Sequence, residues 1–337
     1  MGRQAVRTTQ RRWLTFAALL VSAVPALAQP SQEAGVCHTL TREPALSIVE
    51  AVQMPDVSGA VTHFAVQAPE PPVSRDTLRQ DDIATQLAAA HALFQEVLGL
   101  TPPLHMPRYR HAEAMVVILR DDQVRGGQAY DEVVRNPATP GCHIRMALGG
   151  GVDASGNLTP AHELFHLYQN AHMMFKQGWL HEGLARWSES LLSGDVQPGP
   201  PLPTDSLALE RVMQSSYGAV SFWQRLFYLL DPQGSISLPR SLISLRYQDG
   251  SHVVELERLY GSRFVAPLFD ALHQASIALA QQQQWPLYGW AEAEQRSTHY
   301  NDVILAALRH AISTYTLQPD QPDELRAFMQ LIDARLE

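Results

Sequence analysis

The sequence predicts an α+β fold, with a small mixed sheet in the first half of the chain and a mostly helical C-terminal part. Three observations predict it. Residues 114–119 (A-M-V-V-I-L) form a short apolar run rich in β-branched residues, which is typical of a buried strand. Residues 143–148 (H-I-R-M-A-L) alternate between polar and apolar side chains, as a strand does. Beyond Trp187, apolar residues recur at helical spacing.

Further elements of the sheet precede these strands. Residues 43–68 mix short apolar alternations with turn residues, so we expect strands there. The segment 69–74 (P-E-P-P-V-S) indicates a linker or a rigid turn. Residues 81–100 have the apolar spacing of a helix. We expect residues 143–148 to be the edge strand, where an extended peptide can add main-chain hydrogen bonds.

The second half of the chain is predicted to be helical. Its proline-rich segment 197–203 forces a loop. The sequence therefore predicts two parts, an N-terminal α+β part over residues 29–158 and a helical part over residues 159–337. Helical patterns follow the loop at residues 205–216, 217–230, 252–274, 302–316 and 324–336.

The first 28 residues have the pattern of a secretory signal peptide. Four arginines precede an apolar run at residues 14–26, and Ala26-Leu27-Ala28 is an A-x-A cleavage site. The run is short for a membrane span. We expect cleavage near Ala28, export to the periplasm or out of the cell, and no stable membrane insertion of the mature chain.

Charge and cysteine content narrow the class of protein. The chain has 25 basic and 34 acidic residues and lacks a basic run, so we expect no nucleic-acid partner. Only two cysteines are present, Cys37 and Cys142. In an oxidising compartment an even pair predicts one disulfide, and two separate buried thiols are the alternative.

The motif that carries chemistry is H-E-x-x-H at residues 162–166. His162 and His166 are four residues apart, so on a helix their imidazoles lie on one face. A zinc ion accepts neutral histidine nitrogens at roughly 2.0–2.1 Å. Glu163 can reach a metal-bound water without binding the metal, which is the geometry of a general base. The residues that favour a helix start here are Asn157 or Thr159 as the cap and Pro160 in the first turn.

A catalytic zinc usually has a third protein ligand and one open position. The favoured candidate is Glu182, in the segment G-W-L-H-E-G-L-A-R-W at residues 178–187. The alternative is His172, which has the spacing of the metzincin pattern H-E-x-x-H-x-x-G-x-x-H. In that pattern a glycine turns the chain, but here Gln169 occupies the position, and glutamine is unsuited to a left-handed turn.

The segment around Glu182 resembles the second active-site helix of gluzincin metallopeptidases of the MA clan, in which a W-x-x-E-G-x-A-like sequence supplies a glutamate ligand. The resemblance is best over roughly residues 110–234. It implies a zincin-like fold with a small mixed sheet and active-site helices, and one Zn²⁺ per chain held by His162, His166 and Glu182. Gly183 and Ala185 would let the second helix pack closely against the first.

The resemblance also implies roles for residues outside the ligand set. Tyr217, in S-S-Y-G-A-V-S-F-W, matches a residue that steadies the oxyanion in these proteins; packing against Trp223 is its alternative role. Arg186 stands where many gluzincins have an acid that supports a histidine ligand, and Glu189 or Asp195 could substitute. His181 is expected on the surface. The G-x-M-E-N motif of aminopeptidases is missing, so an endopeptidase is expected.

We therefore expect an exported zinc-dependent metallopeptidase that hydrolyses peptide bonds with a zinc-bound water activated by Glu163. Its substrate would be a peptide or protein. Two alternatives stay open, a catalytically silent metallopeptidase-like binding protein of the cell envelope and a metzincin-like peptidase that uses His172. The sequence does not specify the oligomeric state.

Overall fold

The computed structural model describes residues 37–39, 47–55, 61–68, 74–120, 123–135, 141–315 and 321–337. All of them belong to one unit, Glu33–Glu337. The predicted signal peptide and most of the predicted linker at residues 69–74 lie outside the described residues. The proposed boundary between two parts at residue 158 stays a prediction.

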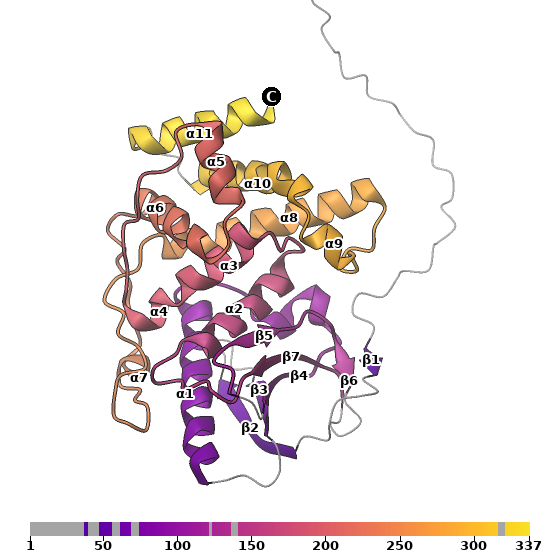
Figure 1. The fold of residues 1–337 in the computed structure, drawn as a ribbon, viewed down its shortest axis with the longest axis vertical. Helices are drawn as coiled ribbons and strands as arrows, with labels where there is room; N and C mark the ends of the chain where they lie inside the picture. Colours follow the sequence, from indigo (N-terminus) through magenta and orange to yellow (C-terminus); the bar gives the residue numbers. More distant parts are fainter. Residues whose placement is uncertain are drawn as a thin grey trace, which may run out of the picture. The chain divides into compact units, whose positions relative to one another are not determined.

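Seven strands of the described chain form one mixed sheet (Figure 1), in the order β1-β6-β7-β4-β3-β2, with β5 also paired to β7. Strands β3, β4 and β7 run parallel, while β2 is antiparallel to β3 and β5 is antiparallel to β7. A mixed sheet accompanied by many helices agrees with the predicted α+β class. The strands are β1 (His38–Thr39), β2 (Ser47–Pro55), β3 (Val61–Ala68), β4 (Ala114–Leu119), β5 (Gly127–Ala129), β6 (Val134–Arg135) and β7 (His143–Leu148).

The prediction that residues 143–148 form an edge strand is wrong. Strand β7 pairs with β4 on one side and with β5 and β6 on the other. All six of its side chains are buried, including its polar residues. Arg145, for example, is covered by the ring of Tyr130 at 4.2 Å from the ring centroid. The alternation therefore did not mark a solvent face, and the neighbour that covers β7 is β5, a strand of three residues beginning with glycine.

Helix α2 (Thr159–His172) lies between the sheet and the C-terminal helices (Figure 1). It packs against α1 (Ser74–Glu96), β5, β7 and α3 (Gly178–Ser188). Its Phe165 contacts Phe94 of α1 edge to face, with ring centroids 5.1 Å apart. Because apolar partners cover α2 on several sides, its polar side chains are held in a buried setting.

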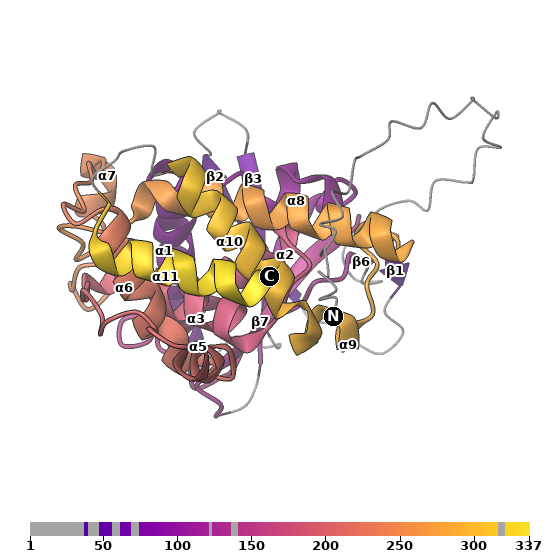
Figure 2. The same cartoon turned by 90° about the horizontal axis from the view of Figure 1, so that it is seen from above.

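The C-terminal helices agree with prediction at four of the five expected places; Figure 2 shows α11 lying across α10. The predicted helix at residues 252–274 is wrong in its first half. There, Val253, Val254 and Leu259 are buried without forming a helix, and Gly261 has a left-handed φ of 70°. The helices are α4 (Ser190–Ser193), α5 (Ser206–Met213), α6 (Val220–Leu230), α7 (Arg240–Ile243), α8 (Val265–Gln283), α9 (Glu292–Gln295), α10 (Asn301–Tyr315) and α11 (Asp323–Leu336).

The predicted disulfide between Cys37 and Cys142 is confirmed, with the two Cα atoms 5.9 Å apart. It joins residues 105 positions apart in the chain. The bond ties the segment beside β1 to the residue that precedes β7. Among the described residues, no helix is both long and apolar enough to cross a bilayer.

Candidate metal centre

The start of α2 agrees only in part with the prediction, because the N-cap residue is Leu158, which makes no side-chain cap hydrogen bond, and not Asn157 or Thr159. The backbone N–H of Thr159 donates to the side-chain oxygen of Asn157 at 2.7 Å, and Pro160 occupies the first turn. Proline fits there because the first helical N–H groups have no partner within the helix. The amide of Asn157 also donates to the carbonyl of Arg125 at 3.1 Å, just before β5. This contact fixes the start of α2 relative to that strand.

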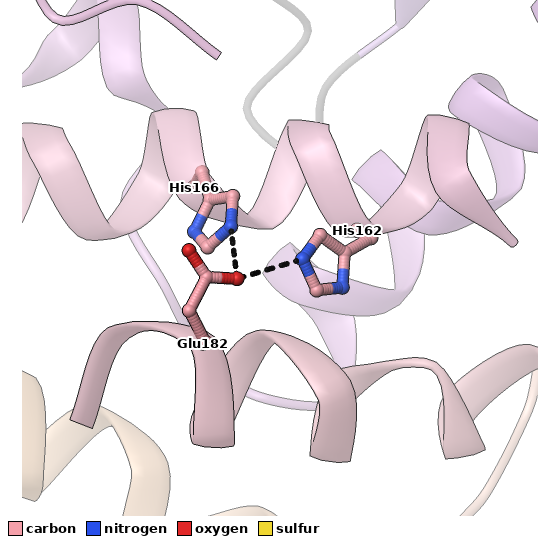
Figure 3. Close-up of side chains that lie close together, drawn as sticks. All are labelled: His162, His166 and Glu182. Carbon is pink, nitrogen blue, oxygen red and sulfur yellow. Dashed lines mark hydrogen bonds and ion pairs between the residues drawn. The ribbon is translucent and has the colours of Figure 1, made fainter. Parts of the chain in front are cut away.

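His162 and His166 project from α2 toward Glu182, which comes from α3 (Figure 3). The Nε2 atoms of His162 and His166 lie 3.4 Å and 3.3 Å from the same carboxylate oxygen, Oε2 of Glu182. One ligand atom from each of the three residues lies within 4.8 Å of the other two. The arrangement thus brings two imidazoles and one carboxylate to a single point.

His172, the alternative third ligand, is not part of this group. It is the last residue of α2, and its Nε2 forms a hydrogen bond with the carbonyl oxygen of Thr101 at 3.0 Å. Its ring contacts Phe269 edge to face, with centroids 5.5 Å apart. The chain continues the helix through Gln169 without the turn that the metzincin pattern requires. His172 therefore contacts Thr101 and Phe269 and is not in the group of His162, His166 and Glu182.

The Nδ1 atom of His162, the ring nitrogen that does not face Glu182, forms a hydrogen bond with a carboxylate. This atom lies 2.9 Å from Oε1 of Glu189, whose other oxygen pairs with Arg186. Glu189 follows Glu182 by seven residues, two helical turns further along the same face. Of the two acids that could substitute for the missing one, the structure places Glu189 and not Asp195 beside the histidine. Burial lowers the pKa of His162, but hydrogen bonds to Glu182 and Glu189 outweigh it and raise that pKa to about 9.

The corresponding nitrogen of His166 forms a hydrogen bond with a side-chain amide instead. This Nδ1 lies 2.7 Å from the side-chain oxygen of Gln169, and the amide nitrogen of Gln169 donates to the carbonyl of His181 at 2.9 Å.

The expectation that His181 lies on the surface is wrong. Its ring is buried and stacks on His166 with centroids 4.0 Å apart and planes 5° from parallel. Burial and the nearby His166 lower the pKa of His181 to about 3, because both disfavour a second positive charge.

Glu163, the residue expected to act as the base, is buried beside the histidines against β5. Its carboxylate accepts a hydrogen bond from the backbone N–H of Ala129, and burial raises its pKa above the ordinary value. Gly127 faces the same side chain. A Cβ on Gly127 would lie 2.5 Å from Cγ of Glu163 and 2.9 Å from Cγ2 of Thr159. Glycine at this position therefore gives the carboxylate its place between strand and helix.

Tyr217 lies at the exposed side of the same group. It begins a short 3₁₀ turn (Tyr217–Ala219), its side chain is 57% exposed, and its ring stacks beside His162 with centroids 5.8 Å apart. Burial of part of the phenol and the neighbouring Glu182 carboxylate raise its pKa to about 12. Trp223, the alternative partner of Tyr217, stacks instead on Trp179 with centroids 5.7 Å apart.

The position of Tyr217 depends on how α3 packs against the chain that follows it. A Cβ on Gly183 would lie 2.9 Å from the indole nitrogen of Trp223 and 3.0 Å from Cβ of Ala219. The indole of Trp223 donates to the carbonyl of Trp179 at 2.8 Å. Gly183 was expected to face α2, but it faces α6 and the 3₁₀ turn. The glycine thus lets the segment with Tyr217 approach α3 closely.

Sequence reasoning missed three contributors to this site, namely Gln169, Gly127 and Ala129. Gln169 had a usable signal, because it lies three residues after His166 and so on the same helix face. Gly127 and Ala129 contribute the space and the backbone N–H of a three-residue strand. Neither contribution depends on a polar or ionisable side chain, so residue type alone does not identify these two positions.

Comparison with known proteins does not assign this chain to a family. No protein-family model matches the sequence, and no curated protein matches it significantly. A solved structure, that of an M1 zinc metallopeptidase from Deinococcus radiodurans, is similar with a TM-score of 0.32 and 14% sequence identity. The match covers 86% of this chain and 52% of that one, so the chain spans about half the length of that protein.

Proposed function

We propose that this protein is a zinc-dependent metallopeptidase with a zincin-like site of the gluzincin type. The observation that carries the proposal is the meeting of His162, His166 and Glu182 at one point, with Glu163 buried directly beside them. A pure binding module has no need for a buried carboxylate next to a metal site. Peptides or proteins are the proposed substrates, and cleavage within the chain is the proposed mode.

The donor set suits zinc. Two neutral imidazole nitrogens and one carboxylate oxygen are the ligands of a common class of catalytic zinc sites, which keep one position open. Both histidines direct Nε2 toward Glu182, since each Nδ1 is occupied by another partner. Such outer partners fix the ring orientation of metal-binding histidines. A zinc ion held by these ligands supplies a Lewis acid that polarises the scissile carbonyl and makes a water molecule acidic.

The residues of this chain would then perform the proton transfers. Glu163 accepts a proton from the attacking water as the water oxygen bonds to the carbonyl carbon. The same carboxylic acid gives that proton to the amide nitrogen as the carbon–nitrogen bond breaks. The N–H of Ala129 holds the carboxylate in position during both steps. Tyr217 donates its phenolic O–H to the oxygen that gains negative charge, as a neutral donor can do without becoming an ion.

Access from solvent supports this assignment of roles. The side chain of Tyr217 is largely exposed, and that of Glu182 is 22% exposed, whereas His162 and His166 are buried. A substrate can therefore approach from the side of Tyr217 while the ligands stay enclosed. We also propose that the protein acts after export, to which the disulfide between Cys37 and Cys142 lends support.

Metal analysis and a peptide library together test the proposal. We expect purified protein to hold about one zinc per chain and to cut peptides, with zinc released by chelators. Glu163→Ala should keep the zinc and lose the cleavage, because Glu163 acts as a base and not as a ligand. A protein that takes up no zinc contradicts the site. One that holds zinc but cuts no peptide supports the catalytically silent alternative.

A further inference from the structure

We propose that Gln169 is a positioning residue of the metal centre, which determines which ring nitrogen of His166 carries the hydrogen and ties that ligand to the helix that carries Glu182. The inference rests on the proposed zinc site. Its basis is a chain of two hydrogen bonds, from the backbone of His181 through the amide of Gln169 to the ring of His166. Glutamine at this position was otherwise only a departure from the metzincin pattern.

The donors and acceptors in these two hydrogen bonds follow from the carbonyl group of His181, which cannot donate a hydrogen bond. The carbonyl of His181 only accepts hydrogen bonds, so the amide end of Gln169 that faces it at 2.9 Å must be the nitrogen. The oxygen of the same amide therefore faces Nδ1 of His166 at 2.7 Å. An amide oxygen only accepts, so Nδ1 carries the hydrogen. In the neutral ring, which is the form that binds a metal, the lone pair of His166 is then on Nε2, the atom that faces Glu182.

Burial makes this arrangement effective. The side chain of Gln169 is 0% exposed, so water does not compete for either of its hydrogen bonds. A buried polar group left without its partner is unfavourable, which disfavours the flipped amide and the wrong histidine tautomer. His181 also covers one face of the His166 ring by stacking on it. The orientation of the ring and its tautomer are thus both fixed.

The same amide links the two helices next to their ligands. On α2 it holds His166, and on α3 it holds the residue immediately before Glu182. Loss of the amide should therefore weaken metal binding in two ways, by freeing the ring and by loosening the position of Glu182. The binding of the metal itself, and not only the chemical step, should respond.

Replacement of Gln169 by methionine tests the inference, because methionine has similar size and no hydrogen-bonding amide. Metal affinity would be measured by titrating the metal-free protein with Co²⁺, followed by visible absorption, and by competing Zn²⁺ against a chelator. We expect Gln169→Met to lower the affinity for both metals by about 10- to 100-fold, which is the usual effect of losing a hydrogen-bond partner of a metal-binding histidine. The thermal midpoint of the metal-free variant would show whether it folds.

Two further variants separate positioning from packing. Gln169→Glu keeps an acceptor for His166 but loses the donor to His181, so its metal affinity should exceed that of Gln169→Met. Gln295→Met is the matched control, since Gln295 is also buried and donates to a backbone carbonyl, that of Trp290. It should leave metal affinity unchanged. Should Gln169→Met not fold, Gln169→Asn, whose amide is too short to reach both partners, takes its place.

The possible outcomes distinguish this inference from the proposed function. Wild type that binds zinc, together with a folded Gln169→Met that binds it equally well, overturns the role of Gln169 and leaves the proposed function standing. Wild type that binds neither Co²⁺ nor Zn²⁺ overturns the zinc site itself. Equal losses in Gln169→Met and Gln295→Met would assign the effect to general packing and would also overturn the inference.

Discussion

His162 and His166 lie on the same helix and face the same oxygen of Glu182, yet their surroundings differ. His162 has a carboxylate behind it, from Glu189, which itself pairs with the exposed Arg186. His166 has a neutral, fully buried amide behind it, from Gln169, and a stacked imidazole beside it. One side of the site is charged and close to solvent, while the other is neutral and enclosed.

The difference shows that the proposed ligands and the residues that hydrogen-bond to them are determined by different features of the chain. The spacing of H-E-x-x-H fixes which side chains share a helix face. The partners of the outer nitrogens come from wherever the fold places a suitable acceptor, here α2 itself for one histidine and the end of α3 for the other. A carboxylate acceptor makes an imidazole more basic than an amide does, so the two ligands should respond differently to substitution.

The largest expected effect comes from removing the residue that both histidines share. Glu182→Gln replaces a charged oxygen ligand by a neutral amide of the same size, which is a poorer zinc ligand. We expect zinc binding and peptide cleavage to collapse, by more than the roughly 100-fold that loss of an outer partner causes. His172→Ala should leave both nearly unchanged, because His172 contacts Thr101 and not the site. The opposite pattern would favour the metzincin-like alternative.

A second substitution acts on the base and spares both histidines. Gly127→Ala places a Cβ within 2.5 Å of Cγ of Glu163, so the carboxylate must move. We expect kcat to fall by about 100-fold, at the lower end of the roughly 10²–10⁴-fold that a well-placed base contributes, because the carboxylate is displaced and not removed, with zinc content unchanged. Steady-state kinetics and metal analysis measure this. Gly156→Ala is the control, since a Cβ on Gly156 meets nothing within 4 Å. A loss of zinc in Gly127→Ala would contradict the assigned role.

The charged side of the site should be sensitive to Glu189. Glu189→Gln keeps an oxygen that can accept from His162 but removes the negative charge. We expect zinc affinity to fall by about 10-fold, toward the lower end for an outer partner, because the hydrogen bond can persist. Chelator competition measures the change. An affinity equal to that of wild type would show that charge behind His162 has no role, and the contrast between the two histidines would lose its meaning.

The metal-free protein should reveal the same contrast through pH. Hydrogen bonds to Glu182 and Glu189 outweigh burial and raise the pKa of His162 from 6.5 to about 9. A group whose pKa is higher in the folded state stabilises fully below its unfolded pKa and loses that contribution as pH rises through the folded pKa. The thermal midpoint of chelated protein should therefore fall between about pH 6.5 and 9, and less steeply in Glu189→Gln. A flat midpoint would contradict this coupling.

Much of this site could be predicted from the sequence because the positions of the proposed ligands follow from spacing and residue type. His162, Glu163 and His166 share one motif, and Glu182 sits in a segment that the structure places on the adjacent helix. The disulfide was predictable because the chain has only two cysteines. Strands β4 and β7 were also found in their predicted places.

Other features depended on long-range packing, which local patterns do not encode. Strand β5 has three residues and begins with glycine, so no periodicity marks it, and the sequence alone therefore predicts β7 at the edge. The apolar residues within 253–259 are buried without helical structure, because the backbone partners of this segment lie elsewhere in the chain, such as the carbonyls of Leu192 and Gly234. His181 is buried only because α2 and α3 meet there.

The smallest expected effect concerns Arg186, the outermost residue on the charged side. Its side chain is 55% exposed, and it pairs with Glu189 three residues later. Exposed pairs of this kind contribute about 0–1 kcal/mol, so Arg186→Ala should weaken zinc binding by no more than about 5-fold. Arg326→Ala is the matched control, because Arg326 is 52% exposed and pairs with Asp323 at the same spacing, on α11.

If Arg186 acts through Glu189, its effect should disappear once that acid is neutralised. The double variant Arg186→Ala with Glu189→Gln should therefore bind zinc as Glu189→Gln does, within the error of chelator competition. Additive losses in the double variant would show that Arg186 affects the site by another route, since residues coupled through one contact give non-additive effects. Arg186→Ala and Glu189→Gln could instead reduce zinc affinity equally. That result would mean that Glu189 supports His162 only while Arg186 is paired with it.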